Sequence, residues 1–426
     1  MVLLSVCSQW TWASLPIQYW QTSSGARVYF VENHDLPMLD ISVEFAAGSG
    51  MDTPGQSGRA RLVQHLLGLG AGGLSEDQIA TALADVGAQL KSHFDRDRAG
   101  IALRTLSSER ERKQALDILA RIIQHPEFPQ DVVLREKART IAGIKEASTK
   151  PDYIGERELM KMLYGAHPYG FNEAGEIDAL NRLQREDLLA FYRSYYVAGN
   201  AVIAIIGDVT RLEAAEIAEL LTENLAPGGQ EMEVPPVSIP VAGIKRIPHP
   251  ATQSHIQLAY PGLRRSDPDY FPLLVGNHIL GGGGFVSRLM EEVRQQRGLA
   301  YSVYSFFSPY KEQGPFQIGL QTKKEQSEEA FELTRKVLKD FVATGPTEEE
   351  LTAAKQNIIG GFPLRIDSNS KILGFLSIIG FYHLPLTYLT DYLSAVEAVT
   401  TEQIRQAFQQ RIQPDGMVAV IVGAVE

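Results

Sequence analysis

The sequence predicts an α+β fold made of two homologous domains, each a mostly antiparallel sheet covered by helices. The first observation is an internal repeat: residues 183–207 align without a gap on residues 399–423, which lie 216 residues further along the chain. Each copy begins with an amphipathic helix that has an acidic residue near its start, and ends in a continuous apolar run. Such a run is typical of a buried central strand. A spacing of about half the chain indicates a duplicated layer of helices on a sheet.

The second observation places the boundary between the two domains. A chain of 426 residues is too long for one ordinary core. Its long segment rich in proline and glycine runs from Ala226-Pro227-Gly228-Gly229 to Pro248-His249-Pro250, and this composition is typical of a linker. We predict an N-terminal domain over residues 15–225, a linker over 226–248 and a C-terminal domain over 249–426.

Within each domain, apolar runs predict strands and amphipathic periods predict helices. In the N-terminal domain we expect strands near 27–32 and 39–47, helices near 57–70 and 75–86, paired strands within 88–105, and helices at 109–123 and 129–148. In the C-terminal domain we expect a strand at 254–260, helices at 267–280 and 285–296, strands at 300–308 and 314–321, and helices at 326–343 and 347–359. The helices are expected to cover one face of each sheet.

The composition excludes two classes of protein. Apolar residues make up 44% of the chain and charged residues 21%, and no apolar run approaches the length of a membrane span. The net charge is −11, and lysine and arginine cluster only in short pairs such as Arg264-Arg265 and Lys323-Lys324. We therefore expect a soluble protein with no nucleic-acid partner.

Residues 1–14 predict an exported or periplasmic protein. They combine a short apolar run with the small-residue pattern Thr11-x-Ala13, as a signal peptide does, but they lack its basic start. The alternative is a loose N-terminal arm on a cytoplasmic protein. Cys7 is the only cysteine, and it follows Leu4-Ser5-Val6 in an unusual version of a lipoprotein signal. The rest of the chain cannot form a disulfide, which suits either compartment.

One predicted helix carries an incomplete version of a metal-binding motif, Arg61-Leu62-Val63-Gln64-His65. A zinc peptidase needs three protein ligands and a carboxylate that takes a proton from the bound water. A His pair at i and i+4, with Glu before the second His, supplies two ligands and the base on one face. Here those places hold Arg61, Gln64 and His65. Because Arg61 would also repel a dication, we interpret His65 as a packed, hydrogen-bonded core histidine and expect no bound metal.

The C-terminal domain carries a second motif, and this one is intact. We interpret Gly281 to Gly284 as a close-packed turn, because a phosphate loop needs a Lys-Ser/Thr that is missing. The run LMEEVRQQRGLAYSVYS then leads from a helix into a strand whose alternation puts Tyr301 and Val303 on one face. Arg294 and Tyr301 lie seven residues apart across this helix-to-strand turn, and the spacing alone would predict ordinary surface residues.

This run closely resembles the C-terminal signature of the pitrilysin-type (inverted zincin) metallopeptidases, the family of insulin-degrading enzyme and mitochondrial processing peptidase. The resemblance spans nearly all of residues 16–426. It implies a processing-peptidase-like metallohydrolase fold that forms half of a clam-shell chamber. Arg294 and Tyr301 match the family's substrate-holding pair, with Arg297 as the second candidate for the arginine. The family's third zinc ligand is a glutamate on a later helix, and Ala142 or Gly143 stands in its place.

The resemblance implies a subunit that has substrate-holding groups but no zinc of its own. Bacterial members commonly work as heterodimers in which one subunit carries the zinc and the other the Arg-Tyr pair. We therefore predict a non-catalytic, substrate-binding subunit whose partner is a homologous zinc-bearing peptidase and whose substrates are unfolded peptides. The alternative is a purely structural or peptide-binding pseudopeptidase without a catalytic partner. An independent enzyme with other chemistry is disfavoured, because Ser, Asp and His show no triad or elbow spacing.

Overall fold

The computed structural model describes residues 16–229 and 233–423, so the signal-like segment 1–14 lies outside the described residues. The N-terminal unit is built on a six-stranded sheet in which β2 and β8 are parallel and the other neighbours are antiparallel. Its strands, in spatial order, are β1 (Gln18–Gln21), β2 (Arg27–Glu32), β8 (Ala201–Gly207), β3 (Met38–Phe45), β7 (Ala99–Leu106) and β6 (Gln89–Phe94).

The C-terminal unit repeats this strand order and so confirms the predicted fold class. Its five-stranded sheet pairs β9 with β13 in parallel and all other neighbours antiparallel. Its strands, in spatial order, are β11 (Ala300–Phe307), β12 (Pro315–Lys323), β10 (Gln253–Pro261), β13 (Val418–Val422) and β9 (Gly243–Ile247). The strands β2 and β9 start at residues 27 and 243, which is the 216-residue spacing of the sequence repeat.

Strand β9 lies inside the segment 226–248 that was predicted to be a linker. Sequence reasoning missed it because the strand is only five residues long, carries two cations and sits at the sheet edge with little burial. The last part of that segment is therefore the first strand of the C-terminal unit.

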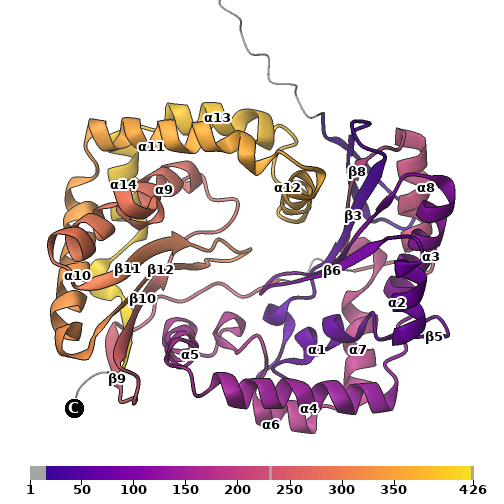
Figure 1. Ribbon diagram of the computed structural model, residues 1–426, viewed down its shortest axis with the longest axis horizontal. Helices are drawn as coiled ribbons and strands as arrows, with labels where there is room; N and C mark the ends of the chain where they lie inside the picture. Colours follow the sequence, from indigo (N-terminus) through magenta and orange to yellow (C-terminus); the bar gives the residue numbers. More distant parts are fainter. Residues whose placement is uncertain (1–15, 230–232, 424–426) are drawn as a thin grey trace, which may run out of the picture.

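Helices cover the outer face of both sheets (Figure 1). Several begin with a capping box, in which a Ser or Thr side chain accepts from the third backbone N–H of the helix; examples start at Ser75, Thr210, Thr347 and Thr400. The helices of the N-terminal unit are α1 (Arg59–Leu66), α2 (Glu76–Ala84), α3 (Glu109–Gln124), α4 (Gln130–Ala147), α5 (Pro151–Tyr164), α6 (Ile177–Arg182), α7 (Arg185–Tyr195) and α8 (Arg211–Thr222). Those of the C-terminal unit are α9 (Tyr270–Asn277), α10 (Ser327–Thr344), α11 (Glu348–Gly361), α12 (Asn369–Phe381), α13 (Tyr388–Ala398) and α14 (Thr401–Arg411).

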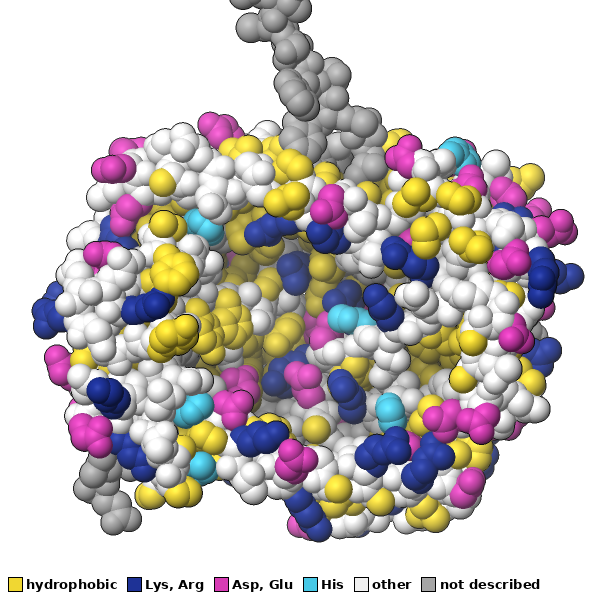
Figure 2. All heavy atoms as spheres, viewed as in Figure 1, with side chains coloured by type: hydrophobic (Ala, Val, Ile, Leu, Met, Phe, Trp, Pro, Cys, Tyr) yellow, Lys and Arg dark blue, Asp and Glu magenta, His cyan; other side chains and the backbone are white. Residues whose placement is uncertain are grey.

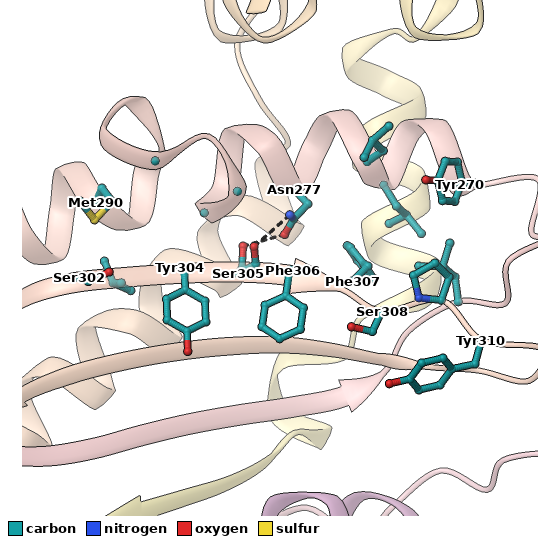
Figure 3. Close-up of a pocket in the computed structure, with 18 of the residues that line it drawn as sticks. Tyr270, Asn277, Met290, Ser302, Tyr304, Ser305, Phe306, Phe307, Ser308 and Tyr310 are labelled. Atoms are coloured by element: carbon teal, nitrogen blue, oxygen red, sulfur yellow. Dashed lines mark hydrogen bonds between the residues drawn. The ribbon is translucent and has the colours of Figure 1, made fainter. Parts of the chain in front are cut away.

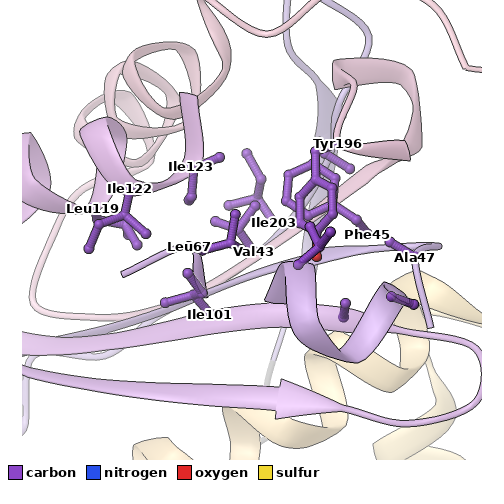
Figure 4. Packing of buried hydrophobic residues seen from close by; sticks show 14 of the residues in the cluster. Val43, Phe45, Ala47, Leu67, Ile101, Leu119, Ile122, Ile123, Tyr196 and Ile203 are labelled. Atoms are coloured by element: carbon purple, nitrogen blue, oxygen red, sulfur yellow. The ribbon is translucent and has the colours of Figure 1, made fainter. Parts of the chain in front are cut away.

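The core of the N-terminal unit lies between α3 and the central strands (Figure 4). Val43, Ile101 and Ile203 come from β3, β7 and β8, and they meet Leu119 and Ile123 of α3; all five are almost fully buried. Truncating one such side chain to alanine typically costs about 2–5 kcal/mol. This packing fixes the sheet on which α1 is seated.

One helix of each unit packs on the sheet of the other unit. Helix α5 lies against β13 and β10, and α12 lies against β8, β3 and β2. A glycine lies at each contact: a Cβ at Gly155 would lie 2.7 Å from Oε1 of Gln257, and a Cβ at Gly380 would lie 2.6 Å from Cγ1 of Val202. The two units are therefore interlocked by a reciprocal exchange of helices, and the side chains between them enclose a hollow (Figure 2).

Within the described ranges 16–229 and 233–423, no helix is both long and apolar enough to cross a lipid bilayer.

Candidate functional site

A cavity of about 870 Å³ opens on the inner wall of the C-terminal unit. Strand β11 and the turns before it supply most of its lining, and the N-terminal unit adds Asp95 and Arg98 at its margin. Aromatic and cationic side chains dominate the wall; they include Arg265, Tyr270, Phe285, Arg294, Tyr301, Tyr304, Phe306, Tyr310 and Tyr382.

Arg294 and Tyr301, the pair singled out from the sequence, meet on this wall. The guanidinium of Arg294 lies 4.7 Å from the ring centroid of Phe285 and 5.1 Å from that of Tyr301. Arg294 lies on a short π-helix, Met290–Gln296. Gly298 follows this helix with a positive φ of 64°, and the backbone N–H of Leu299 donates to the carbonyl of Val293 at 2.9 Å. This reversal brings the strand back alongside the helix, so that the tyrosine ring stacks on the arginine.

The polar ends of this pair are available to a ligand. Among the residues that the structure describes, neither the Arg294 guanidinium nor the Tyr301 hydroxyl has a hydrogen-bond partner, and Tyr301 is 80% exposed. Arg297, the second candidate for the arginine, is exposed at the end of the same helix and does not line the cavity. The geometry therefore favours Arg294.

The predicted strand alternation is wrong at the start of β11. Val303 is buried, whereas Tyr301 is exposed, although both were expected on one face. The ladder pairs Ala300 with Thr322 and Val303 with Leu320, so three steps on β11 match two on β12. This bulge rotates the strand locally and directs Tyr301 into the cavity.

Beyond the bulge, β11 supplies an aromatic row that sequence reasoning missed. Tyr304 and Phe306 lie on one side of the strand with their rings 6.0 Å apart, and Tyr310 continues the row (Figure 3). Ser305 points to the opposite side, where its hydroxyl donates to Oδ1 of Asn277 at 2.7 Å. The signal in the sequence was the alternation of aromatic residues at 304 and 306.

The incomplete metal motif lines a second cavity, of about 510 Å³, between α1 and α4. Arg61 and His65 face it from α1, and Gly143 faces it from α4, whereas Ala142 is exposed and does not line it. Gln64 is buried and points into the sheet, where its Nε2 donates to the carbonyl of Gly100 at 3.3 Å. The cavity thus lacks the ligand and the base that a zinc peptidase would place there.

His65 is hydrogen-bonded, as expected, but it is not a core residue. Its side chain is 47% exposed, because α1 turns Leu62, Val63 and Leu66 toward the core and leaves His65 toward α4. Its Nε2 lies 3.0 Å from Oε2 of Glu136. Sequence reasoning did not assign Glu136, although it lies two helical turns before Gly143 and so on the same face.

Glu136 is a buried carboxylate surrounded by cations. Arg135 donates to its Oε1 at 2.7 Å, and Arg139 contacts both oxygens at 3.2 Å. Burial alone would raise the pKa of Glu136, but the hydrogen bonds from His65 and Arg135 and the charge of Arg139 outweigh it, so the pKa lies below its ordinary value. The carboxylate stays ionised and already paired.

The donor set does not fit a zinc ion. Across the described ranges, no group of three or more His, Cys, Asp and Glu side chains is placed to hold a metal. His65 and Glu136 would supply two ligands, and Glu173, the other carboxylate of the cavity, pairs with Arg96. Arg61 and Arg139 line the same cavity. Two guanidinium charges beside an incomplete ligand set oppose a dication.

A charged turn between β6 and β7, Asp95-Arg96-Asp97-Arg98, ties the two units together. The buried carboxylate of Asp97 accepts a hydrogen bond from the Tyr169 hydroxyl of the N-terminal unit. It also accepts two from the C-terminal unit, from the Tyr382 hydroxyl at 2.8 Å and from the Lys311 backbone N–H at 2.6 Å. Burial, with the neighbouring charge of Asp95, raises the pKa of Asp97 to about 6. Two residues of this turn, Asp95 and Arg98, also line the cavity.

The chain matches two protein-family models. The model described as Insulinase (Peptidase family M16) matches residues 27–174, and the model described as Peptidase M16 inactive domain matches residues 182–358. The crystal structure of a peptidase M16 inactive domain from Pseudomonas fluorescens is 38% identical, covers 96% of this chain and 98% of that one, and has a TM-score of 0.93.

Two bacterial relatives are similar over almost their whole length. YmxG of Bacillus subtilis, described as an uncharacterized zinc protease, is 26% identical over 95% of this chain and 98% of its own. YmxG of Helicobacter pylori, described as a non-peptidase homologue, is 26% identical over 93% of this chain and 91% of its own. These matches identify the chain as a member of peptidase family M16, the insulinase family, in which α1 carries Arg61 and Gln64 in place of the first histidine ligand and the glutamate base.

Proposed function

We propose that this chain is the substrate-binding subunit of a heterodimeric zinc metallopeptidase, in which Arg294 and Tyr301 hold a peptide at the zinc site of a homologous partner subunit. The observation that carries the proposal is the stacked Arg294–Tyr301 pair, whose donors face the cavity without partners among the described residues. Donors of this kind hold a carbonyl and stabilise oxyanion charge, but they need a nucleophile from elsewhere.

The inner wall suits an unfolded peptide. Strand β11 is an edge strand, so an extended chain can add to it through backbone hydrogen bonds. The aromatic row of Tyr304, Phe306 and Tyr310 offers apolar surface for side chains of such a peptide. We further propose that the protein acts after export, in the periplasm, on the basis of the signal-like residues 1–14.

The first expected result concerns the isolated chain. It should hydrolyse no peptide and hold no stoichiometric zinc, because Arg61, Gln64 and Gly143 stand where a ligand, the base and the third ligand are needed. Metal analysis of protein purified without chelators tests this. One tightly bound zinc per chain, with activity lost on chelation, would overturn the proposal.

The second result concerns a complex reconstituted with a homologous subunit that carries an intact HxxEH motif. Tyr301→Phe and Arg294→Ala should each lower turnover of a quenched fluorogenic peptide, roughly tenfold to a thousandfold if the donors act on the transition state. Zinc content and assembly should not change. Arg297→Ala is the matched control, because this arginine lies on the same helix but does not line the cavity.

The alternative function is a peptide-binding or structural pseudopeptidase without a catalytic partner. Full peptidase activity of both the Tyr301→Phe and Arg294→Ala complexes would favour it. So would the absence of any intact M16 subunit among the proteins that co-purify with the chain.

A further inference from the structure

The cavity between α1 and α4 is lined by Arg61, whose guanidinium group is not paired with another polar group of the described chain. Arg61 is exposed, and its side chain lies over the ring of Phe94, the last residue of β6, at 5.0 Å. Among the residues that the structure describes, it has no hydrogen bond or ion pair. Stacking on the ring holds the side chain in place and leaves its N–H donors free.

The other charges in this cavity are already balanced. The buried carboxylate of Glu136 is hydrogen-bonded to His65, Arg135 and Arg139. Glu173, on the opposite rim, pairs with the buried Arg96 at 3.4 Å. With both carboxylates neutralised by other cations, the charge of Arg61 is left to attract an anion.

The cavity also has room for such a group. A Cβ at Gly143 would meet no atom within 4 Å, so the space opposite Arg61 is open. Thr140 lines the same cavity, and a threonine side chain carries a neutral hydroxyl donor. Planar guanidinium donors match the geometry of a carboxylate, which two N–H groups can bind side by side.

We propose that this cavity, which replaces the zinc site, binds the C-terminal carboxylate of a peptide. Strand β6 is the free edge of the N-terminal sheet, and Arg61 lies beside its last residue. A peptide that pairs with β6 and ends beside Phe94 therefore brings its terminal carboxylate to Arg61. The proposal rests on the proposed function only in that peptides enter the hollow; it needs no partner subunit.

The test uses the full chain and three fluorescein-labelled decapeptides of alanine, valine and serine, followed by fluorescence anisotropy. One peptide has a free C-terminal carboxylate, one is amidated, and one is amidated with a single internal glutamate. The free acid should bind roughly threefold to tenfold more tightly than either amide at low salt, and the difference should shrink at high salt.

Arg61→Gln should abolish this difference without weakening the binding of the plain amide, and Arg61→Glu should reverse it. Arg193→Gln is the matched control, because Arg193 is an exposed helical arginine without a side-chain partner in the described chain. Equal melting temperatures of the variants and the wild type show that folding is unaffected.

Each remaining outcome counts against the proposal in a different way. Equal affinity of the acid and the plain amide overturns the carboxylate site but leaves peptide binding intact. If the glutamate-containing amide binds as tightly as the acid, the site accepts any carboxylate and the assignment to a chain terminus fails. If none of the peptides binds, the proposed peptide-binding function fails as well.

Discussion

At the scale of single residues, Asp97 couples the ionisation of one carboxyl group to the contact between the two units. Its oxygens accept donors from both units, and its pKa in the folded protein is about 6, against an ordinary value of 3.8. Between these two values the folded state holds a proton that the unfolded state has lost. The contribution of Asp97 to stability is therefore fully present below about pH 4 and is lost as the pH rises through 6, by about 3 kcal/mol in total.

Asp97→Asn should remove this pH dependence, because the amide keeps the shape of the side chain but does not titrate. Relative to wild type, the variant should gain stability as the pH rises from 4 to 7, as measured by melting temperatures in a buffer series. Asp178→Asn, a change at an exposed helix residue, should keep the wild-type profile. Parallel profiles for Asp97→Asn and wild type would show that Asp97 titrates as an ordinary carboxyl group.

At the scale of elements, the glycine turn before Arg294 is set by close packing against β11. A Cβ on Gly281 would lie 2.4 Å from Oγ and 2.6 Å from the backbone N of Ser305. Gly281→Ala should therefore lower the free energy of unfolding by about 1–3 kcal/mol and displace the helix that carries Arg294. Gly360→Ala, in helix α11 where a Cβ meets no atom within 4 Å, should be neutral or stabilising. Equal melting temperatures of the two variants would contradict this account.

The elements that sequence could predict are those whose pattern is local. Strands such as β3 and β8 and helices such as α3 and α4 follow from apolar runs and amphipathic periods, and Arg294 and Tyr301 follow from one contiguous motif. Helices α5 and α12 were not among the expected elements. Residues such as Ile372 and Leu376 of α12 gain their role only on the sheet of the other unit.

The parts of the site that sequence could not reveal join distant residues. His65 and Glu136 are 71 positions apart, and the Tyr382 donor to Asp97 is 285 positions away. No spacing rule connects such pairs, because only the packing of α4 on α1, and of one unit on the other, brings them together. The bulge that turns Tyr301 outward depends likewise on pairing with β12 rather than on the residues of β11 alone.

At the scale of the whole molecule, limited proteolysis should cut first between Pro227 and Pro250. The described residues just before β9 include strongly exposed side chains, with Val241 at 91% and Ile239 at 69%, whereas β9 is paired with β13. The first cut should therefore fall before Gly243. The two fragments should still elute as one particle in size-exclusion chromatography and separate only in denaturant. A first cut in the middle of either unit would contradict the predicted boundary.

The reciprocal exchange of α5 and α12 also restricts how the two units can move relative to each other. Two units joined only by a linker can swing apart, but here each unit carries a helix that packs closely on the other unit's sheet. A hinge motion would have to pull both helices off together and expose the apolar faces beneath them. We therefore expect the chain to move as one rigid body. In the proposed heterodimer, the movement that admits or releases a peptide would then occur at the interface with the partner subunit.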